Sequence, residues 1–309
     1  MASVIVLGPQ RPDVNLGQAL GKLDGNGDLA VVSAGWQEGE SDLDALREIV
    51  QSPLVDLQLY GRAEALFQND AWLKEQYRNR QEKLIELQRL YRVRLPRYMQ
   101  AARDLLQESS DRTLLRLEQR QAISQQRTLD RHHLRRISAI NAEFSSRLDD
   151  KPSSALEDNR EEILEALAGC RTVLITGGNV AVLLNRLQLF DLGSPLKEKN
   201  IIAWSAGAMV LTERIVLFHD NTPEGERDAE IFNEGLGIVG RVVFLPDARH
   251  RLRTDDRNRL ALMSRRFAPA TCMTLDNGSM LQFADGHLLA ADNVRRLARS
   301  GSLRKVLRQ

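Results

Sequence analysis

The sequence predicts an α/β fold, in which a mainly parallel sheet is flanked by helices and carries a long helical-hairpin insertion. Short apolar runs that end in glycine alternate with helix-like segments in residues 1–58, and the same alternation resumes after residue 150. Residues 59–150 show helical spacing of apolar side chains and no strand-like run. We therefore expect residues 1–58 and 151–309 to share one sheet as a discontinuous domain, with residues 59–150 as an inserted helical arm.

The first 58 residues contain two strand–helix pairs. Strands are expected at 3–8 and 28–35, where apolar runs are closed by glycine, and helices at 15–23 and 41–50. Parallel strands need such crossover helices, so this order favours a parallel sheet.

The arm is expected to hold two or three long helices. Leu84, Leu87 and Leu90 recur at helical spacing, Pro96 suits the first turn of a new helix, and Ser110 or Asp111 could cap the next one. A solvated surface accounts for the modest excess of basic residues here. Stacking aromatics and a concentrated basic stripe are missing, so nucleic acid is not expected as a partner.

Apolar faces on so long a hairpin must be buried somewhere. A partner subunit is the simplest answer, so we predict a homo-oligomer, most simply a dimer formed through the arm. Part of the arm could also cover a cleft in the α/β domain.

The α/β pattern resumes after a linker at 149–161. Helices are expected at 161–169, 180–190, 208–214 and 255–267, and strands at 172–178, 200–207 and 240–246. Asn-Gly and Asp-Gly pairs separate three further short strands between 271 and 292, which is typical of a hairpin or meander. The basic tail, 294–309, is interpreted as an amphipathic helix or a frayed end.

Composition excludes several classes of protein. A net charge of +1 gives no global attraction to nucleic acid or membranes, and no apolar run approaches the roughly 20 residues of a membrane helix. The two cysteines, Cys170 and Cys272, form no disulfide or metal framework, and no histidine pair has metal-ligand spacing. The first residues do not resemble a signal peptide. We expect a cytoplasmic protein without metal or other cofactor.

Ser205 stands at the bend between an expected strand and an expected helix. A serine on such a bend can form a nucleophile elbow, with the helix N-terminus beneath it and backbone N–H groups ready to hold an oxyanion. The small neighbours Ala206, Gly207 and Ala208 fit so crowded a turn. The alternative is a small residue placed there only for close packing.

A Gly-Gly turn follows the preceding strand. Gly177, Gly178 and Asn179 end that strand, and ends of neighbouring parallel strands lie side by side. The turn could therefore aim a backbone N–H at the space in front of Ser205. It lacks the lysine of a P-loop and the spacing of a dinucleotide-binding turn, so nucleotide binding is discounted.

The two motifs, "TGGN" and "WSAGA", resemble the dipeptidase E/cyanophycinase family of serine peptidases, which share the class I glutamine amidotransferase-like fold. The similarity is loose over 1–58 and closer over about 165–290, while the arm has no counterpart. The resemblance implies that Ser205 is the nucleophile and that Gly178 and the Ala206 N–H form the oxyanion hole. It places the acidic triad residue at Asp220.

The resemblance also implies a base histidine after the next strand, and Asp247 stands in its place. A carboxylate with a pKa near 4 is a feeble base for a serine hydroxyl. His250 lies three residues further on and could reach the site, as could His219, or neither does and the protein is a degenerate relative. His132, His133 and His287 are interpreted as ordinary surface residues.

Two functions remain open from the sequence. The first is a serine hydrolase of small peptides, by resemblance acidic or β-aspartyl ones, with Ser205, His250 or His219, Asp220 and Asp247 as candidate catalytic residues. Candidate substrate-binding residues are Gly177, Asn179, Trp36 and Arg249, and Glu38 could join the substrate wall or dock the arm. The second is a catalytically degenerate member that acts as a binding or oligomeric scaffold through its arm.

Overall fold

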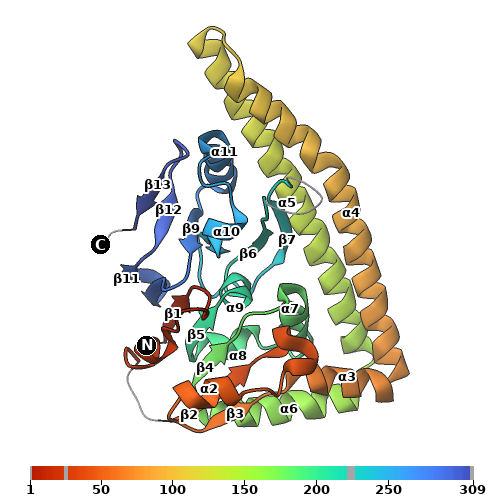
Figure 1. The fold of residues 1–309 in the computed structure, drawn as a ribbon. Coiled ribbons are helices and arrows are strands. Elements are labelled where there is room, and N and C mark those ends of the chain that lie inside the picture. Colours follow the sequence, from red (N-terminus) through yellow and green to blue (C-terminus); the bar gives the residue numbers. More distant parts are fainter. Residues whose placement is uncertain (1, 24–26, 221–226, 307–309) are drawn as a thin grey trace.

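The computed structural model describes residues 2–23, 27–220 and 227–306. It confirms the predicted fold class: a mainly parallel sheet lies between helices, and a long helical arm extends along one side (Figure 1). The described N- and C-terminal segments lie on the side of the molecule away from the arm.

The main sheet combines strands from both ends of the chain. In the described part, seven strands lie in the order β11-β10-β1-β5-β4-β2-β3. Strands β1 (Ser3–Leu7), β5 (Asn200–Trp204), β4 (Cys170–Ile175), β2 (Asp28–Val32) and β3 (Leu54–Asp56) are parallel. Strands β10 (Met280–Ala284) and β11 (His287–Asp292) add an antiparallel edge. The division into domains stays a prediction.

Both faces of this sheet are buried, which explains why its strands read as continuous apolar runs. In β4, Val173 belongs to one apolar cluster and Leu174 to the other. Helices α1 (Leu16–Leu20) and α2 (Asp44–Ile49) pack on the face of Leu174. The opposite face is covered by α3 (Leu59–Asn69), α6 (Ser154–Ala168), α7 (Val180–Leu189) and α9 (Ala206–Val210). A short helix, α8 (Gly193–Lys197), precedes β5.

Residues 1–58 and 151–309 share the main sheet, as expected, but several strands of 151–309 lie outside it. Four described strands form a second sheet, in the order β13-β12-β9-β8: β8 (Val242–Pro246), β9 (Thr271–Leu275), β12 (Arg295–Leu297) and β13 (Leu303–Lys305). Strands β6 (Arg214–Leu217) and β7 (Glu230–Glu234) form a separate ribbon. The Asp285-Gly286 turn of the β10–β11 hairpin has positive φ at both residues, as predicted, whereas Asn277-Gly278 carries the chain from one sheet to the other.

The interpretation of the tail, 294–309, as an amphipathic helix or a frayed end is wrong for the residues described. Residues 294–306 form β12, a turn and β13, and residues 307–309 lie outside the described part. Gly301, with a φ of 80°, sits in the turn, and a Cβ at this position would lie 1.8 Å from the carbonyl oxygen of Arg257. The turn thus needs a glycine, which ends any helix there.

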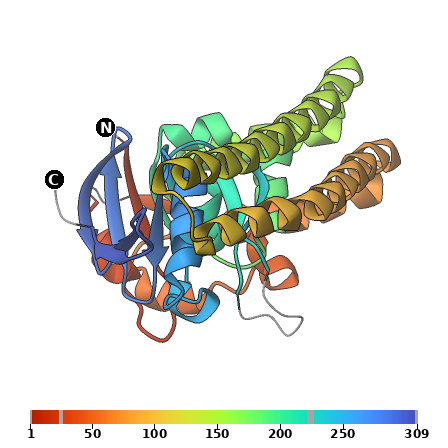
Figure 2. The same ribbon diagram turned by 90° about the horizontal axis from the view of Figure 1, so that it is seen from above.

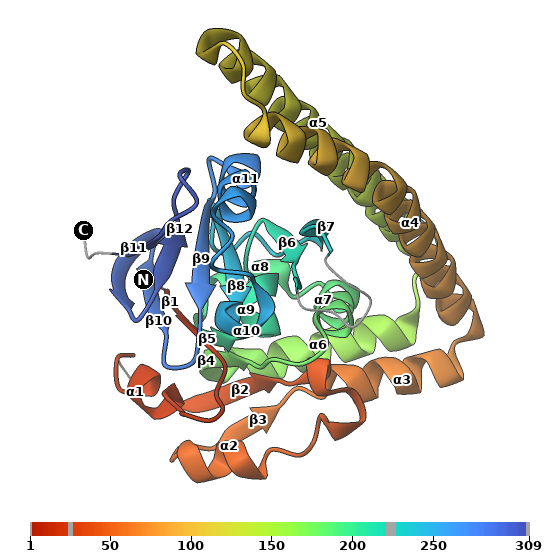
Figure 3. The same ribbon diagram turned by 45° about the horizontal axis from the view of Figure 1, so that its top comes forward.

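The arm consists of α4 (Ala71–Gln107) and α5 (Arg112–Asp150), which pack antiparallel and extend past the α/β body (Figures 2 and 3). Asp111 caps α5 as predicted, accepting hydrogen bonds from the N–H groups of Thr113 and Leu114. Pro96 does not begin a helix but lies inside α4. A proline costs a helix about 3 kcal/mol, and burial of the flanking Leu95 and Met99 between the helices offsets part of that cost.

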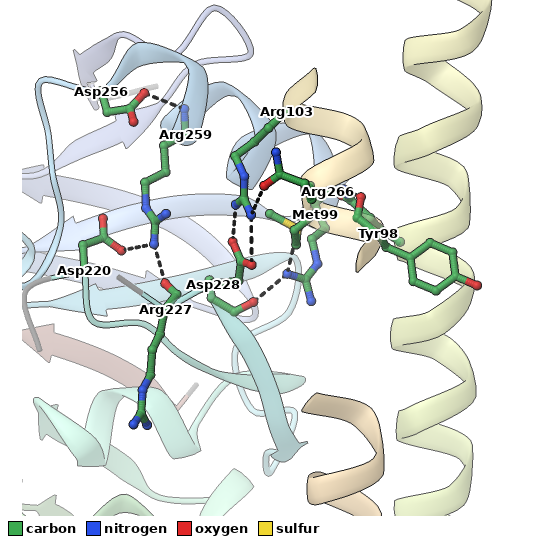
Figure 4. A network of polar contacts seen from close by, with 12 residues as sticks. Tyr98, Met99, Arg103, Asp220, Arg227, Asp228, Asp256, Arg259 and Arg266 are labelled. Carbon is green, nitrogen blue, oxygen red and sulfur yellow. Dashed lines mark hydrogen bonds and ion pairs between the residues drawn. The ribbon is translucent and has the colours of Figure 1, made fainter. Parts of the chain in front are cut away.

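The arm docks on its own α/β body through a buried polar network. The fully buried Arg266 of α11 (Arg257–Phe267) donates to both carboxylate oxygens of Asp130 in α5 at 2.7 Å and to the hydroxyl of Tyr91 in α4 at 2.6 Å. Figure 4 shows the neighbouring contact, in which Arg103 of α4 binds Asp228. Much of the apolar face that was expected to need a partner subunit is therefore covered within the chain.

His133 belongs to this interface, so its interpretation as a surface residue is wrong. Its ring is 2% exposed, stacks on Tyr91 with centroids 4.1 Å apart, and lies 2.8 Å from the amide oxygen of Gln88. Burial lowers the pKa of His133 to about 4, so its imidazole is neutral near neutral pH.

Candidate active site

Ser205 occupies the sharp turn between β5 and α9. Its backbone has φ 52° and ψ −116°, a region that residues with a side chain rarely adopt and that costs on the order of 1–3 kcal/mol. Its side chain makes no capping hydrogen bond to the helix that it precedes. The hydroxyl is thus held at a strained position without serving the local structure.

Gly207 allows this turn to lie directly on the end of the neighbouring strand. A Cβ at Gly207 would lie 2.2 Å from the carbonyl oxygen of Ile175 and 2.7 Å from that of Thr176. Ala206 and Ala208 beside it are buried. The small residues noted in the sequence are therefore explained by the close approach of α9 to β4, and that approach fixes where Ser205 stands.

The Gly-Gly turn lies against Ser205, as expected from neighbouring parallel strands. Strands β4 and β5 pair with Ile175 opposite Ala203. A Cβ at Gly177 would lie 3.0 Å from the Cβ and 3.5 Å from the Oγ of Ser205. Any side chain at Gly177 would fill the space in front of the hydroxyl.

Gly178 is held in place from its other side by the loop after β2. It has φ 102°, and a Cβ there would lie 2.2 Å from the carbonyl oxygen of Gly35, which also accepts from the N–H of Asn179 at 2.7 Å. The side-chain oxygen of Asn179 caps α7 by accepting from Ala181 and Val182. This use of Asn179 differs from its predicted role in substrate binding.

The two amides proposed for the oxyanion hole have no internal acceptor. Within residues 2–23, 27–220 and 227–306, no carbonyl or side-chain oxygen accepts a hydrogen bond from the N–H of Gly178 or of Ala206. The first N–H groups of any helix lack an intrahelical partner, which accounts for Ala206. Both groups are available to a bound ligand.

Asp247 and His250 form a hydrogen-bonded pair at the end of β8. Asp247 adopts the left-handed conformation, with φ 57°, and begins the short helix α10 (Ala248–Arg251). This turn brings the Nδ1 of His250 to 2.6 Å from an Asp247 carboxylate oxygen. The pairing raises the pKa of His250, because the carboxylate favours the imidazolium. The His250 side chain is 83% exposed.

Asp220 does not have the partner that the resemblance implies. Its buried carboxylate accepts from the backbone N–H of Arg253 at 2.9 Å and from the guanidinium of Arg259 at 2.5 Å (Figure 4). Within the described residues it accepts no hydrogen bond from an imidazole. The carboxylate that contacts His250 is instead that of Asp247, at the position where the resemblance implies a histidine.

No imidazole contacts the nucleophile candidate directly. In the part of the chain that the structure describes, no histidine lies within hydrogen-bonding distance of the Ser205 hydroxyl. His219, next to Asp220, has a buried Nδ1 without a hydrogen-bond partner among these residues. The structure therefore brings together Ser205 with Gly177 and Gly178, and Asp247 with His250, as two separate groups.

The remaining candidates line up at the same edge of the fold. Trp36 packs partly buried against the apolar cluster that contains Trp204, beside the Ser205 turn. Glu38 accepts from the hydroxyl of Tyr60 at 2.9 Å, so it contacts the helix α3 that leads into the arm. Arg249 is exposed and lies beside Asp276, which accepts from its backbone N–H at 2.9 Å.

Two residues at this edge were missed by sequence reasoning. Asp276 directly follows β9, which pairs in parallel with β8. A carboxylate placed just after a predicted strand could therefore have indicated that Asp276 lies at this edge. Gln37, in the short 3₁₀ segment Ala34–Gly39, has φ 58° and ψ −123°, close to the angles of Ser205. The residues around Gln37 in the sequence do not predict this strained conformation.

A comparison with protein-family models connects this geometry with known proteins. Residues 153–290 match the model of peptidase family S51. The match confirms the resemblance to the dipeptidase E/cyanophycinase family over this S51 segment, and it supports a serine-peptidase-like hydrolase. Ser205, Gly178, Asp220 and Asp247 all lie within the S51 segment, whereas the arm lies before it.

Two further comparisons used the whole chain, one with solved structures and one with curated proteins. Among solved structures, the crystal structure of a peptidase from an acI-B1 Actinobacterium aligns over 97% of this chain and 91% of its own, with a TM-score of 0.47 and 12% sequence identity. The comparison with curated proteins found no match.

The described residues contain no group of three or more His, Cys, Asp or Glu side chains placed to hold a metal ion. Among the described helices, none combines the length and apolar character needed to cross a bilayer.

Proposed function

We propose that this protein is a serine hydrolase of small peptides, with Ser205 as its nucleophile. The observation that carries the proposal is the strained φ of Ser205 at a strand–helix turn whose hydroxyl has no structural role. Attack of the Ser205 hydroxyl on a peptide carbonyl would form a tetrahedral intermediate, whose oxyanion could accept hydrogen bonds from the free amides of Gly178 and Ala206. Collapse of this intermediate would break the C–N bond, release the protonated amine and leave an ester on Ser205, which water would then hydrolyse.

The proposed general base is His250, oriented by Asp247. A serine hydroxyl needs an adjacent base, and an imidazole with a pKa near neutrality serves far better than a carboxylate. With the Nδ1–H directed at Asp247, Nε2 is the ring nitrogen that would accept the proton from Ser205. Catalytic hydrogen bonds are often long before substrate binds, so His250 would close on Ser205 in the complex.

The proposed substrates are acidic peptides, including β-aspartyl ones. Arg249 lies two residues from Asp247, and its exposed guanidinium can bind a substrate carboxylate in a bidentate way. Trp36, beside the same strand ends, would form an apolar wall.

A second candidate function is a catalytically degenerate relative that binds ligands or partners. One observation favours it: the Asp220 carboxylate is bound by Arg259, and no imidazole within the described residues contacts Ser205. In this case the strained turn at Ser205 would persist although Ser205 no longer acts as a nucleophile.

A fluorophosphonate probe that reacts with activated serines separates the two functions. We expect labelling of the wild-type chain, none of Ser205→Ala, and labelling slowed by about 10²–10⁴-fold in His250→Gln. His219→Gln is the matched control and should label at the wild-type rate. A folded wild-type protein that takes up no probe would establish the degenerate alternative, and equal labelling of His250→Gln would refute the assigned base.

A further inference from the structure

Five arginines from three separate segments surround one hollow, whose lining does not include Ser205. The hollow has a volume of about 600 Å³ and lies between α5, the end of α11 and the turn after β12. Its charged lining consists of Arg116, Arg120, Arg127, Arg265 and Arg299. The other lining side chains, Gln119, Ile123 and Ser124, are uncharged.

The arm supplies three of these arginines along one stripe. Arg116, Arg120 and Arg127 are separated by four and seven residues, so they lie on the same face of α5. With a rise of 1.5 Å per residue, the stripe extends for about 16 Å. The sequence does not reveal the whole cluster, because Arg265 of α11 and Arg299 of the β12–β13 turn join the three α5 arginines only in the folded chain.

Two of the arginines are fixed by backbone groups. The Arg127 guanidinium donates to the carbonyl oxygens of Arg265 and Arg266, at the C-terminal end of α11. The Nε of Arg265 donates to the carbonyl oxygen of Arg299 at 3.1 Å. These bonds hold the guanidinium groups in place while leaving their positive charges unneutralised.

Within the described residues, no carboxylate neutralises the five arginines of this hollow. Within the described residues, none of the five arginines forms an ion pair, whereas Arg92, Arg103 and Arg266 each bind a carboxylate. Burial, together with the neighbouring Arg299, Arg131 and Arg214, lowers the pKa of Arg127, as expected for uncompensated positive charge. Like charges gathered in this way destabilise a fold unless an anion binds among them.

We propose that this hollow binds a compact oligophosphate, either free or as the phosphate portion of a small molecule. A terminal phosphate carries about −1.5 to −2 charges near pH 7, so a short phosphate chain matches the charge density better than carboxylates of equal size. Arginine forks bind phosphate oxygens in a bidentate way. The described lining has no aromatic side chain for base stacking, so recognition is directed at the phosphates.

Calorimetric titration of the full-length protein with sodium tripolyphosphate tests this site. We expect saturable one-to-one binding that weakens as sodium chloride rises from about 0.1 to 0.3 M, because salt screens exposed charges. The double variant Arg116→Gln/Arg120→Gln should lower the affinity roughly tenfold or more. Both side chains are exposed and unbonded within the described residues, so the variant should fold normally, which circular dichroism checks.

The matched control is Arg135→Gln/Arg136→Gln, which removes two exposed arginines from the same helix outside the hollow. It should bind as the wild type does. The proposal fails if tripolyphosphate does not bind saturably or if both double variants lose affinity equally. It also fails if the tricarboxylate tricarballylate binds as tightly, or if a short DNA duplex binds more tightly and depends on Arg116 and Arg120.

Discussion

Ser205 and Asp247 both hold a positive φ, 52° and 57°, at the ends of strands β5 and β8. The first angle lifts a hydroxyl out of the turn, and the second turns the chain so that His250 returns to the Asp247 carboxylate. Asp tolerates the left-handed region better than most residues, because its short polar side chain can hydrogen-bond locally. The proposed base, His250, therefore lies one helical turn after the position where the resemblance implies a histidine.

The pH dependence of labelling follows from this pair. Asp247 raises the pKa of His250 by favouring the protonated ring, and only the neutral ring can act as a base. The rate of probe labelling should therefore rise with pH through a midpoint above the ordinary histidine value of about 6.5. Asp247→Asn removes the carboxylate and should move the midpoint to lower pH, which rate measurements between pH 5 and 9 would reveal. An unchanged midpoint would separate His250 from the reaction.

Arg249 gives a second prediction at the residue scale. If its guanidinium binds a substrate carboxylate, Arg249→Gln should raise KM for aspartyl dipeptides by roughly tenfold or more and leave neutral dipeptides unaffected. Steady-state hydrolysis of the two peptide classes measures this, with Arg253→Gln as a neighbouring control. An equal loss on both classes would show that Arg249 supports the fold and not specificity.

Part of the site could be predicted from the sequence because it depends on short-range patterns. A buried run followed by Ser205 and small residues specifies a strand–helix turn, and Gly177-Gly178 after the adjacent strand specifies its neighbour. The spacing of three residues only suggests that Asp247 and His250 could meet. Their contact also requires the left-handed conformation of Asp247, which no local sequence pattern predicts. The partner of Asp220 could not be predicted, because Arg259 comes from a helix 39 positions away.

At the scale of elements, the long helices were evident from periodicity but their environment was not. Pro96 looked like a helix start because local propensity ignores the antiparallel partner that keeps α4 continuous. His133 looked exposed because nothing in its own segment shows that Tyr91 stacks on it. The tail looked helical, but the tight turn at Gly301 pairs it into strands β12 and β13. Tertiary contacts decided each of these cases.

The docking of the arm should depend on one buried ion pair. Asp130→Asn would leave the fully buried Arg266 without its counter-charge, which typically costs about 3–5 kcal/mol. Urea denaturation should show this loss, whereas Asp104→Asn, near the exposed end of α4, should leave stability nearly unchanged. Equal stability of Asp130→Asn and the wild type would mean that the apolar contacts alone hold the arm.

At the scale of the whole molecule, self-association through the arm stays a prediction. The arm keeps large apolar side chains in solvent even after it docks, with Ile85 68% and Val93 62% exposed. Sedimentation equilibrium should find a dimer that Ile85→Lys/Val93→Lys converts to a monomer. Leu164→Lys, at an exposed apolar position outside the arm, is the control. A monomeric wild type would leave the arm with an intramolecular role only.

The position of β1 in the main sheet has a consequence for biosynthesis. This strand is translated before both of its neighbours, yet it hydrogen-bonds to Ile201–Trp204 on one side and to Met280–Ala284 on the other. Its N–H and C=O groups must stay hydrated, or shielded by a chaperone, until Met280–Ala284 have been translated. Nascent chains stalled before residue 280 should therefore leave this apolar segment accessible to protease, and the sheet should be completed only after β10 has left the ribosome.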